Sequence, residues 1–521
     1  MYDYVIVGAG SAGCVLAGRL SEDPDVRVLL LEAGGPNSRA EIHIPAAFSK
    51  LFQGDLDWNY RTVPQAAASG RDLYWPRGKV LGGSSSINAM IYIRGHAADY
   101  DGWAADGCAG WGYADVLPYF KRSEDNARGA GPYHGAGGPL RVEDPRQPSP
   151  ISDAFVEASE ALGLGHTPDF NGAQQEGAGL YQLTQRRGRR ESAADAFLKP
   201  ARRRRNLTVW TGALAHRIVV ERGRAVGVEV ARNGAVQTVR AEREVLVCGG
   251  AVNSPQLLML SGIGPAPALR AHGIQVVADR AEVGENLQDH LIVGLRWRLR
   301  EPVSLVNAER LGSIARYLLF RSGQLTSNIA EAGLFAHTRA GQAAPDLQFH
   351  VAPALFENHG LVPPTEHGFS LGPTLVGTQS RGRVTLTRAD PETHPAIDPQ
   401  ALSDPADLET LVRGVELARE IVEAGPFRRW RGEAVAPLAT DRAGIERYVR
   451  DTCETLYHPV GTCRMGADAD AVVDLDLRVR GVDGLRVVDA SVMPTIPNGN
   501  TNAPTLMIAE RAADRIRQTT A

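Results

Sequence analysis

The chain has 521 residues, which predicts two to four domains and a sizeable hydrophobic core. Hydrophobic residues make up 43% and charged residues 22%, so a disordered or collagen-like chain is excluded. With 56 basic and 60 acidic residues the net charge is −4, which argues against a nucleic-acid partner. The 56 glycines are more than usual and predict backbone positions that a side chain would obstruct.

The five cysteines predict neither a disulfide framework nor a metal site, because their number is odd and none forms a CxxC pair. We expect them to be small core residues in a reducing compartment. The sequence has no run of 18 apolar residues and does not begin with the basic region of a signal peptide. We therefore expect a cytoplasmic protein, and leave peripheral attachment to the cytoplasmic membrane open.

The first 32 residues have the pattern of a dinucleotide-binding unit. A buried strand is predicted at Tyr4–Val7, followed by the sequence GAGSAG at residues 8–13 and by a helical pattern. A second strand, Val26–Leu31, ends at Glu32. This strand–glycine–helix–strand–acid context is far more specific than the glycines alone, although it does not separate FAD from NAD.

Each residue of this pattern has an expected task. Gly8 allows the tight turn, Gly10 lets a pyrophosphate approach the backbone, and Gly13 lets the helix pack on the strand. The helix N-terminus would face the diphosphate, and Glu32 would accept hydrogen bonds from ribose hydroxyls.

A second glycine-rich segment lies at residues 74–95. Gly82 and Gly83 precede three serines at 84–86, which predicts a backbone that presses against a flat or anionic ligand. Lys79 is one of only four lysines in a chain rich in arginine, which suggests a specific need for lysine there. A plain glycine–serine turn is the alternative interpretation.

The middle of the chain changes character twice. Residues 126–150 predict a loop or lid, residues 207–230 a strand–turn–strand unit, and residues 244–264 another strand–glycine–helix unit with its helix starting at Ser254. Residues 298–454 lack a glycine fingerprint and predict a separate domain. Its expected elements are strands near 346–353 and 383–387 and an amphipathic helix at Pro405–Ile421.

Two polar features stand near the C-terminus. His458 precedes a proline in a glycine-rich segment, and Asn500 and Asn502 flank Thr501 ahead of a predicted helix. Alone, the histidine would be taken as a satisfied structural residue and the asparagines as a helix cap or turn.

Together these motifs resemble the glucose–methanol–choline (GMC) oxidoreductases, which oxidise alcohols with FAD. The resemblance covers nearly the whole chain, and within the family it is greatest to bacterial choline dehydrogenases and to alkanol or polyglycol dehydrogenases. The five matching motifs are GAGSAG with Glu32, residues 76–88, residues 250–264, residues 458–466 and residues 488–504.

The resemblance implies an α/β fold in which a Rossmann-like FAD-binding domain is interleaved with an α+β substrate domain on a largely antiparallel sheet. The expected FAD-binding segments are 1–145, which includes the lid, 200–297 and 455–521. The expected substrate segments are 146–199 and 298–454.

The resemblance also implies site residues. His458 would take the proton of the substrate hydroxyl, and Asn502 would hydrogen-bond the developing alkoxide. FAD is expected to bind non-covalently, because Ile87 stands where some members attach it through a histidine. The expected cofactor contacts are Gly8, Gly10, Ser11, Ala12, Gly13, Glu32, Ala33, Trp75, Val80, Gly82, Gly83, Ser84, Asn88, Ala89, Met90, Ala215, Asp489, Ala490, Asn502 and Pro504.

The substrate pocket is expected to involve Glu331, His350 and Tyr457, with packing at the domain interface as the alternative for Glu331 and His350. Choline oxidases carry a serine where this chain has Ala89, so the resemblance to them is weaker.

The expected reaction is oxidation of a primary alcohol to an aldehyde, with hydride transfer to the flavin N5 assisted by a base. A choline dehydrogenase and an oxygen-using alcohol oxidase are the main alternatives. A lyase, a flavin-binding protein without turnover and an NAD enzyme are more distant ones. The electron acceptor (quinone, dye or oxygen) and the oligomeric state are not predicted.

Overall fold

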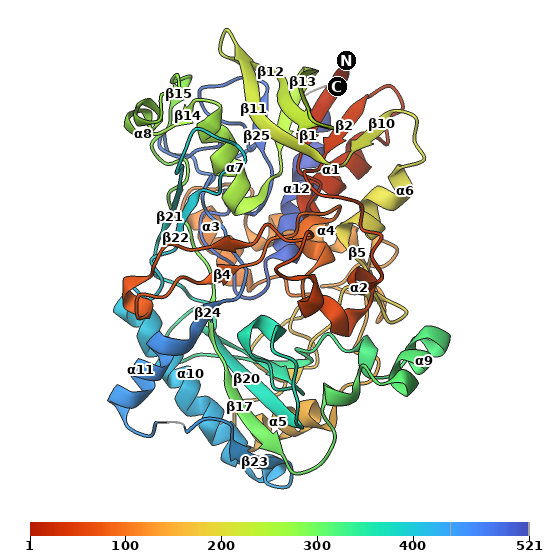
Figure 1. Ribbon diagram of the computed structural model, residues 1–521, viewed down its shortest axis with the longest axis vertical. Helices are drawn as coiled ribbons and strands as arrows, with labels where there is room; N and C mark the ends of the chain where they lie inside the picture. The colour runs from red at the N-terminus through yellow and green to blue at the C-terminus, as the bar shows by residue number, and fades with distance from the viewer. Residues whose placement is uncertain (438, 519–521) are drawn as a thin grey trace.

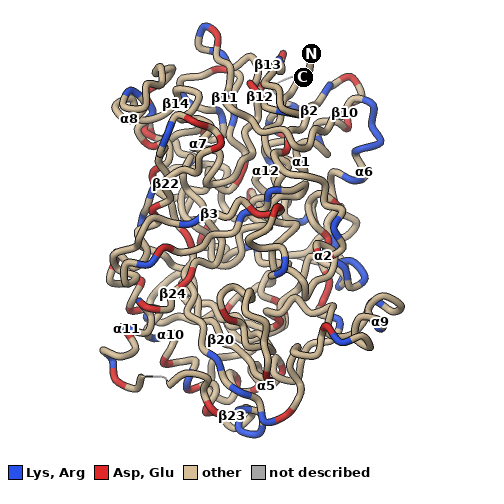
Figure 2. Tube along the Cα trace, viewed as in Figure 1, with Lys and Arg blue, Asp and Glu red and all other residues tan. Residues whose placement is uncertain are grey.

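The structure is a computed structural model that describes residues 1–437 and 439–518. Figure 1 shows an elongated molecule with one large sheet toward each end. Acidic and basic residues are interspersed over both ends (Figure 2). None of the helices in the described part of the chain is both long enough and apolar enough to cross a membrane.

A parallel sheet forms the core of the upper region in Figure 1. Neighbouring strands run in the order β10 (Leu207–Trp210), β2 (Val28–Leu31), β1 (Tyr2–Val7) and β13 (Ala235–Val247), and β25 (Leu485–Val487) also pairs with β13. β2 is buried along its whole length, as expected for a parallel strand covered on both faces. It begins two residues later than predicted, because the N–H of Val26 still belongs to the preceding turn and donates to Asp23.

The first and last helices lie together against this sheet (Figure 1). α1 (Ser11–Leu20) contacts α12 (Asn502–Gln518), and Arg19 donates two hydrogen bonds, of 2.9 and 2.7 Å, to the buried Glu510 carboxylate. Segments nearly 500 residues apart in sequence thereby build one nucleotide-type unit.

β13 is long enough to join two ladders. Its first half pairs with an antiparallel meander, β11 (Ala213–Glu221) and β12 (Arg224–Arg232), and its second half belongs to the parallel sheet. The strand–turn–strand unit predicted at 207–230 is therefore present as β10, β11 and β12.

α7 (Gly250–Leu260) begins four residues before the predicted start at Ser254 and carries Pro255 inside the helix. A proline leaves the carbonyl four residues earlier without its helical donor. Here that carbonyl, of Ala251, accepts a 2.7 Å hydrogen bond from the Thr462 hydroxyl instead. The helix can therefore continue through the proline.

The lower region holds the predicted antiparallel sheet. Its strands are β7 (Gly177–Leu180), β16 (Leu291–Val293), β17 (Leu295–Leu299), β18 (Ala332–Ala336), β19 (Leu347–Ala352), β20 (Gly368–Leu375), β23 (Arg431–Ala434) and β24 (Cys453–Thr455). β16 and β17 begin before residue 298, so the antiparallel sheet starts earlier in the chain than the predicted segment boundary.

Other predicted elements in this region are found with small changes. The amphipathic helix is α10 (Pro405–Glu423), which begins at an Asp404 side chain that accepts a hydrogen bond from Ala406 and packs on β20. The predicted strand near 383 is β21 (Arg383–Thr385), which pairs only with β22 (Ala396–Asp398). The segment predicted as a loop or lid contains β6 (Leu140–Val142), paired with β5 (Glu124–Asn126).

The remaining helices cover the outside of the two sheets or the connections between them. They are α2 (Ala40–His43), α3 (Ala97–Ala105), α4 (Tyr113–Ser123), α5 (Pro150–Ala161), α6 (Lys199–Ala201), α8 (Ala266–Ala271), α9 (Leu311–Phe320) and α11 (Arg442–Thr452). The five cysteines are buried and free, as expected for small core residues.

Candidate active site

A cavity of about 690 Å³ lies between the two sheets. On one side it is lined by residues at the carboxyl ends of β1, β2 and β13, the edge at which open α/β sheets bind ligands. On the other side it is lined by residues of the antiparallel sheet, among them Ile292, His350 and Leu371. The cavity thus spans both regions and lies within the usual size range of ligand pockets.

The GAGSAG turn has the geometry that a dinucleotide needs. Gly8 has φ +101°, and a Cβ there would lie 2.4 Å from the Cys248 carbonyl oxygen. A Cβ on Gly13 would lie 1.9 Å from the carbonyl oxygen of Gly8, so this glycine serves helix–strand packing as predicted. A Cβ on Gly10 would meet only open space beside the cavity, and α1 begins after Gly10 without a side-chain cap. Free N–H groups at that helix start suit a diphosphate.

Glu32 lies at the end of β2 and lines the same cavity. Its two carboxylate oxygens accept 2.9 Å hydrogen bonds from the N–H groups of Ala9 and Gly34. Burial raises the pKa of Glu32 to about 7. Lone pairs remain for ribose hydroxyls, so this residue fits its expected task.

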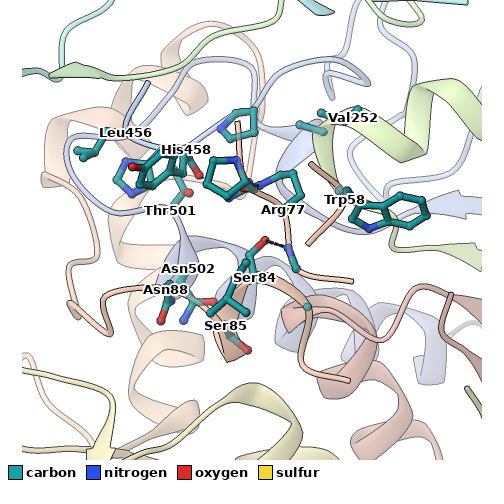
Figure 3. Close-up of a pocket in the computed structure, with 18 of the residues that line it drawn as sticks. Trp58, Arg77, Ser84, Ser85, Asn88, Val252, Leu456, His458, Thr501 and Asn502 are labelled. Carbon is teal, nitrogen blue, oxygen red and sulfur yellow. Dashed lines mark hydrogen bonds between the residues drawn. The ribbon is translucent and has the colours of Figure 1, made fainter. Parts of the chain in front are cut away.

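The second glycine turn meets the first one. A Cβ on Gly83 would lie 2.7 Å from the Cα of Gly10, so a side chain at position 83 would force the two turns apart. Ser84 lines the cavity and accepts a 3.2 Å hydrogen bond from the Gly78 N–H (Figure 3). Ser85 and Ser86 instead donate to carbonyls of their own turn. The serines therefore shape the turn, and only the first two line the cavity.

Behind this turn, Arg190 is buried without a carboxylate partner. Its Nη1 donates a 2.7 Å hydrogen bond to Oδ1 of Asn88, which lines the cavity. Burial lowers the pKa of Arg190 to about 9. The sequence did not single out this arginine, which fixes the orientation of the Asn88 amide.

His458 lies at the junction between the nucleotide side and the substrate side of the cavity. Its backbone N–H donates a 2.7 Å hydrogen bond to Asp289, its Nδ1 lies 3.1 Å from Nδ1 of His290, and its Nε2 lies 3.2 Å from Nδ2 of Asn500. Contacts on both ring nitrogens and on the backbone hold this imidazole in one orientation.

The structure separates the two asparagines of the Asn–Thr–Asn segment. Asn500 contacts His458, whereas Oδ1 of Asn502 accepts a 2.7 Å hydrogen bond from the Ser11 hydroxyl in the GAGSAG turn. In Figure 3, Asn502 lies apart from His458 and toward Ser84 and Asn88. The predicted pairing of His458 with Asn502 therefore differs from the structure, because Asn502 is already the first residue of α12 and turns toward the nucleotide side.

The surroundings keep His458 uncharged. Burial is the main cause that lowers its pKa well below the usual value, and His290, His350 and Arg77 add to it. Burial also lowers the pKa of His290 to about 3. Both imidazoles are therefore neutral near pH 7, and His458 has a lone pair available for a proton.

Asp289 and His290 are functional candidates that the sequence reasoning missed. Asp289 is buried, and burial raises its pKa to about 7. Both residues contact His458 although they are 168 to 169 positions away in sequence. No local sequence motif therefore predicts these contacts. The adjacent acid–histidine pair in LQDH was the only available signal.

Two of the three predicted substrate residues, His350 and Tyr457, line the cavity. His350 is buried with its pKa lowered to about 3, and its Nδ1 lies 3.1 Å from the Thr374 hydroxyl while its Nε2 has no protein partner. The Tyr457 hydroxyl contacts Nδ1 of His359.

Glu331 does not line the cavity, which corrects its expected substrate contact. Its buried carboxylate accepts hydrogen bonds from the Ser149 N–H at 2.7 Å and from the hydroxyls of Ser152 and Ser327 at 2.8 and 2.5 Å. Ser149 caps α5, so the carboxylate sits at a helix N-terminus, where negative charge is favoured. Glu331 is therefore a structural residue that joins the start of α5 to the segment around Ser327.

Replacing Glu331 with glutamine is expected to destabilise the protein by about 1–3 kcal/mol, because three donors lose a charged acceptor. The KM for alcohols should stay unchanged. Urea unfolding measures the change in stability, and steady-state kinetics measure KM. A large rise in KM at unchanged stability would show that Glu331 contacts the substrate after all.

Most expected cofactor contacts line the cavity, and a few do not. The lining set includes Gly8, Gly10, Ser11, Ala12, Glu32, Ala33, Gly83, Ser84, Asn88, Ala89, Met90, Ala215, Asp489, Ala490 and Asn502. Outside the lining are Gly13, Trp75, Val80, Gly82 and Pro504. Gly82 packs instead against Ser86, whose hydroxyl would lie 2.2 Å from an added Cβ, and Trp75 is packed in a core cluster.

Lys79 also has a defined place. Its ammonium lies 4.7 Å from the centre of the Trp58 ring, which lines the cavity, and its charge opposes the rise in the Glu32 pKa. Lys79 therefore lies behind the cavity wall and holds Trp58 by a cation–π contact.

Two family models, both described as GMC oxidoreductase, match residues 2–292 and 378–509. An alcohol dehydrogenase (acceptor) of Pseudomonas putida is 46% identical over 527 residues, covering 99% of this chain and 96% of that protein. An oxygen-dependent choline dehydrogenase of Brucella anthropi is 44% identical over 523 residues, covering 99% and 95%.

Solved structures have the same fold. The crystal structure of pyridoxine 4-oxidase from Mesorbium loti matches with a TM-score of 0.92 at 36% identity and covers 99% of both chains. The expected architecture, a Rossmann-like unit interleaved with an antiparallel substrate unit, is thereby confirmed.

Proposed function

The chain belongs to the GMC oxidoreductase family, whose members oxidise alcohols with FAD, and we propose that it converts an uncharged primary alcohol to the aldehyde with His458 as the base. The observation that carries this proposal is the neutral His458 imidazole, held by His290 and Asn500 at the junction of the nucleotide and substrate sides.

The residues around the two glycine turns fit FAD. The open space at Gly10, the uncapped start of α1 and the Glu32 carboxylate suit the dinucleotide, and Gly83, Ser84 and Asn88 would border the flavin. FAD supplies the hydride acceptor when bound. We propose non-covalent binding, because Ile87 lines the cavity and has no nucleophilic atom. Flavin should therefore stay in solution when the protein is precipitated with acid.

Residues of the chain itself remove the proton from the substrate hydroxyl. His458 Nε2 takes the proton of the substrate hydroxyl, which makes the alcohol a better hydride donor. The Asn500 amide donates a hydrogen bond to the developing alkoxide without a competing charge. Both groups are half-buried in the cavity wall, so a bound substrate would exclude the remaining water and strengthen this interaction.

His290 sets the tautomer of His458. Since Nε2 of His458 faces the amide donor of Asn500, that nitrogen is the acceptor, and the ring proton is on Nδ1. The Nδ1–H group of His458 therefore donates a hydrogen bond to Nδ1 of His290. His290 is neutral, and its own proton is on Nε2. The arrangement therefore keeps the basic lone pair on the nitrogen that faces the substrate.

Replacing His290 with alanine is expected to lower kcat roughly 10–100-fold, the usual range for a partner that orients a reactive histidine. KM should change little, because His290 does not line the cavity. The split between kcat and KM, together with an altered pH profile, distinguishes this positioning role from a general loss of structure, which would lower the amount of folded protein.

The substrate side favours an uncharged molecule. Phe48, Phe52 and Phe356 form an aromatic wall of the cavity. Two of the carboxylates that line this side, Glu357 and Glu454, pair with Arg296 and Arg71. A third, Asp451, accepts a hydrogen bond from the Ser69 hydroxyl. A cationic substrate would thus find two of the three carboxylates already neutralised.

Choline is the second candidate, because aromatic rings can also bind a quaternary ammonium. The discriminating experiment compares a medium-chain alkanol with choline under a dye acceptor. We expect kcat/KM to be higher for the alkanol by at least tenfold. A preference for choline would replace the proposed substrate class, and turnover of neither would contradict alcohol oxidation. Peroxide formation in air then separates an oxidase from a dehydrogenase.

A further inference from the structure

The helix α9 exposes a surface that is unusually apolar. Leu311, Leu318, Leu319 and Phe320 are 86%, 60%, 73% and 70% exposed, and Ile314 is 36% exposed. Of the ten large hydrophobic residues that are exposed in the described part of the chain, these five lie on this one helix of ten residues. Scattered apolar residues are normal on a surface, but a contiguous group indicates a contact.

The body of the protein holds α9 through Tyr317 and leaves the other large apolar side chains of the helix exposed. Tyr317 is the buried residue of the helix, and its hydroxyl donates 3.2 Å hydrogen bonds to the carbonyls of His43 and Gly188. Tyr317 also packs with Ala308 and Leu325 in a small separate core. The helix is thus fixed at one side, and Figure 1 shows it projecting at the edge of the lower region.

Six arginines without ion-pair partners among the described residues lie on α9, at its ends, or on neighbouring segments. Gly188 lies in the turn between β8 (Gln185–Arg186) and β9 (Arg189–Arg190), where an added Cβ would lie 2.8 Å from the Arg321 carbonyl oxygen and 3.2 Å from Cδ of Arg146. Figure 2 shows basic residues gathered between α2 and α9. Within the described residues, no ion pair is formed by any of Arg146, Arg187, Arg189, Arg310, Arg316 and Arg321. The one acid beside the start of α9, Glu309, is paired with Lys50.

We propose that α9 and these six arginines form a docking surface for an anionic lipid bilayer. An amphipathic helix with leucine and phenylalanine outward and basic residues at its rim lies in the bilayer interface, with its apolar side chains among the acyl chains. The arginines would face anionic headgroups. This proposal does not depend on the proposed substrate.

A second copy of the chain fits this surface poorly. In a two-fold contact across α9, the basic cluster of one copy would lie near that of the other, and like charges repel. The apolar face of a ten-residue helix is also far smaller than the roughly 800 Å² per partner of a stable interface. A lipid surface meets both the apolar and the basic requirement.

The docking surface lies beside one wall of the active-site cavity. The core around Tyr317 is contacted by Ile44, which precedes the short helix at Pro45–Leu51, and by Ala46 within this helix. Phe48 of this helix lines the cavity. Docking through α9 would therefore bring the aromatic wall close to the bilayer, from which an apolar molecule could enter.

The test is cosedimentation of the FAD-loaded protein with vesicles of phosphatidylcholine alone and of phosphatidylcholine with phosphatidylglycerol in equal parts. We expect binding to the anionic vesicles, weaker binding to the neutral ones, and loss of binding as salt is added. The double variant Leu318→Asp, Leu319→Asp should bind at least about tenfold more weakly. Arg187→Gln and Arg189→Gln should each weaken binding to anionic vesicles about fivefold.

The matched control is Val236→Asp with Leu162→Asp, which places the same charge on two exposed apolar residues outside α9. It should bind like the unchanged protein, and all variants should keep their activity on a soluble alcohol. Absence of binding to anionic vesicles, or equal binding by the two double variants, would overturn the proposal. So would a dimer in light scattering that Leu318→Asp, Leu319→Asp dissociates, because a second copy would then cover the face.

Discussion

Replacing His458 with alanine is expected to lower kcat/KM for the alcohol roughly 10²–10⁴-fold, the contribution of a well-placed general base. FAD should still bind, since the glycine turns and Glu32 remain intact. The measurement is steady-state turnover of protein whose flavin content is matched by absorbance. The control is His337→Ala, which removes a surface histidine paired with Glu176. Equal losses in both variants would contradict the assigned base.

The pH profile of the unchanged protein tests the same group. His458 works as a base only when unprotonated, and burial lowers its pKa well below 6.5. As the pH falls, kcat/KM should therefore hold through 6.5 and decline only well below it. A decline centred at or above pH 6.5 would show that the base is in water-like surroundings or that another group takes the proton.

Replacing Asn500 with alanine is expected to lower kcat roughly 10²–10³-fold, as the loss of one donor to a developing oxyanion does. Its Nδ2 contacts His458, and its Oδ1 is buried without a protein partner. KM should change less than kcat, because the hydrogen bond is strongest when charge develops on the substrate oxygen.

Asn502→Ala is the matched control for this prediction. Asn502 accepts from the Ser11 hydroxyl at the start of α1, so its loss should weaken FAD binding and leave kcat of the loaded protein within about threefold. Flavin titration and turnover at saturating FAD separate the two effects. If Asn502→Ala lost kcat and Asn500→Ala did not, the pairing drawn from the sequence would be right and the one drawn from the geometry wrong.

The nucleotide side was predictable because its requirements are local. At Gly8 and Gly13 an added Cβ would collide with neighbouring backbone, so the spacing in the sequence reports the turn directly. Glu32 follows from the end of the next strand. The antiparallel sheet was predictable in kind, because alternation in β19 and the capped helix α10 are also local signals.

The substrate side was less predictable because its contacts are distant in sequence. Asn500 and Asn502 share one motif, and their directions differ because α12 begins between them. His290 meets His458 only through the packing of β16 with β24. Glu331 is satisfied by the N-terminus of α5, which no pattern around residue 331 reveals.

Single-turnover bleaching of the flavin tests the central claim most directly. The FAD-loaded protein and its His458→Ala variant are mixed without oxygen with a medium-chain alkanol, and the flavin absorbance is followed. The unchanged protein should bleach rapidly and yield one aldehyde per flavin, while the variant should bleach roughly 10²–10⁴-fold more slowly. Flavin that stays oxidised with every alcohol, or bleaching at equal rates in both proteins, would contradict base-assisted alcohol oxidation at this site.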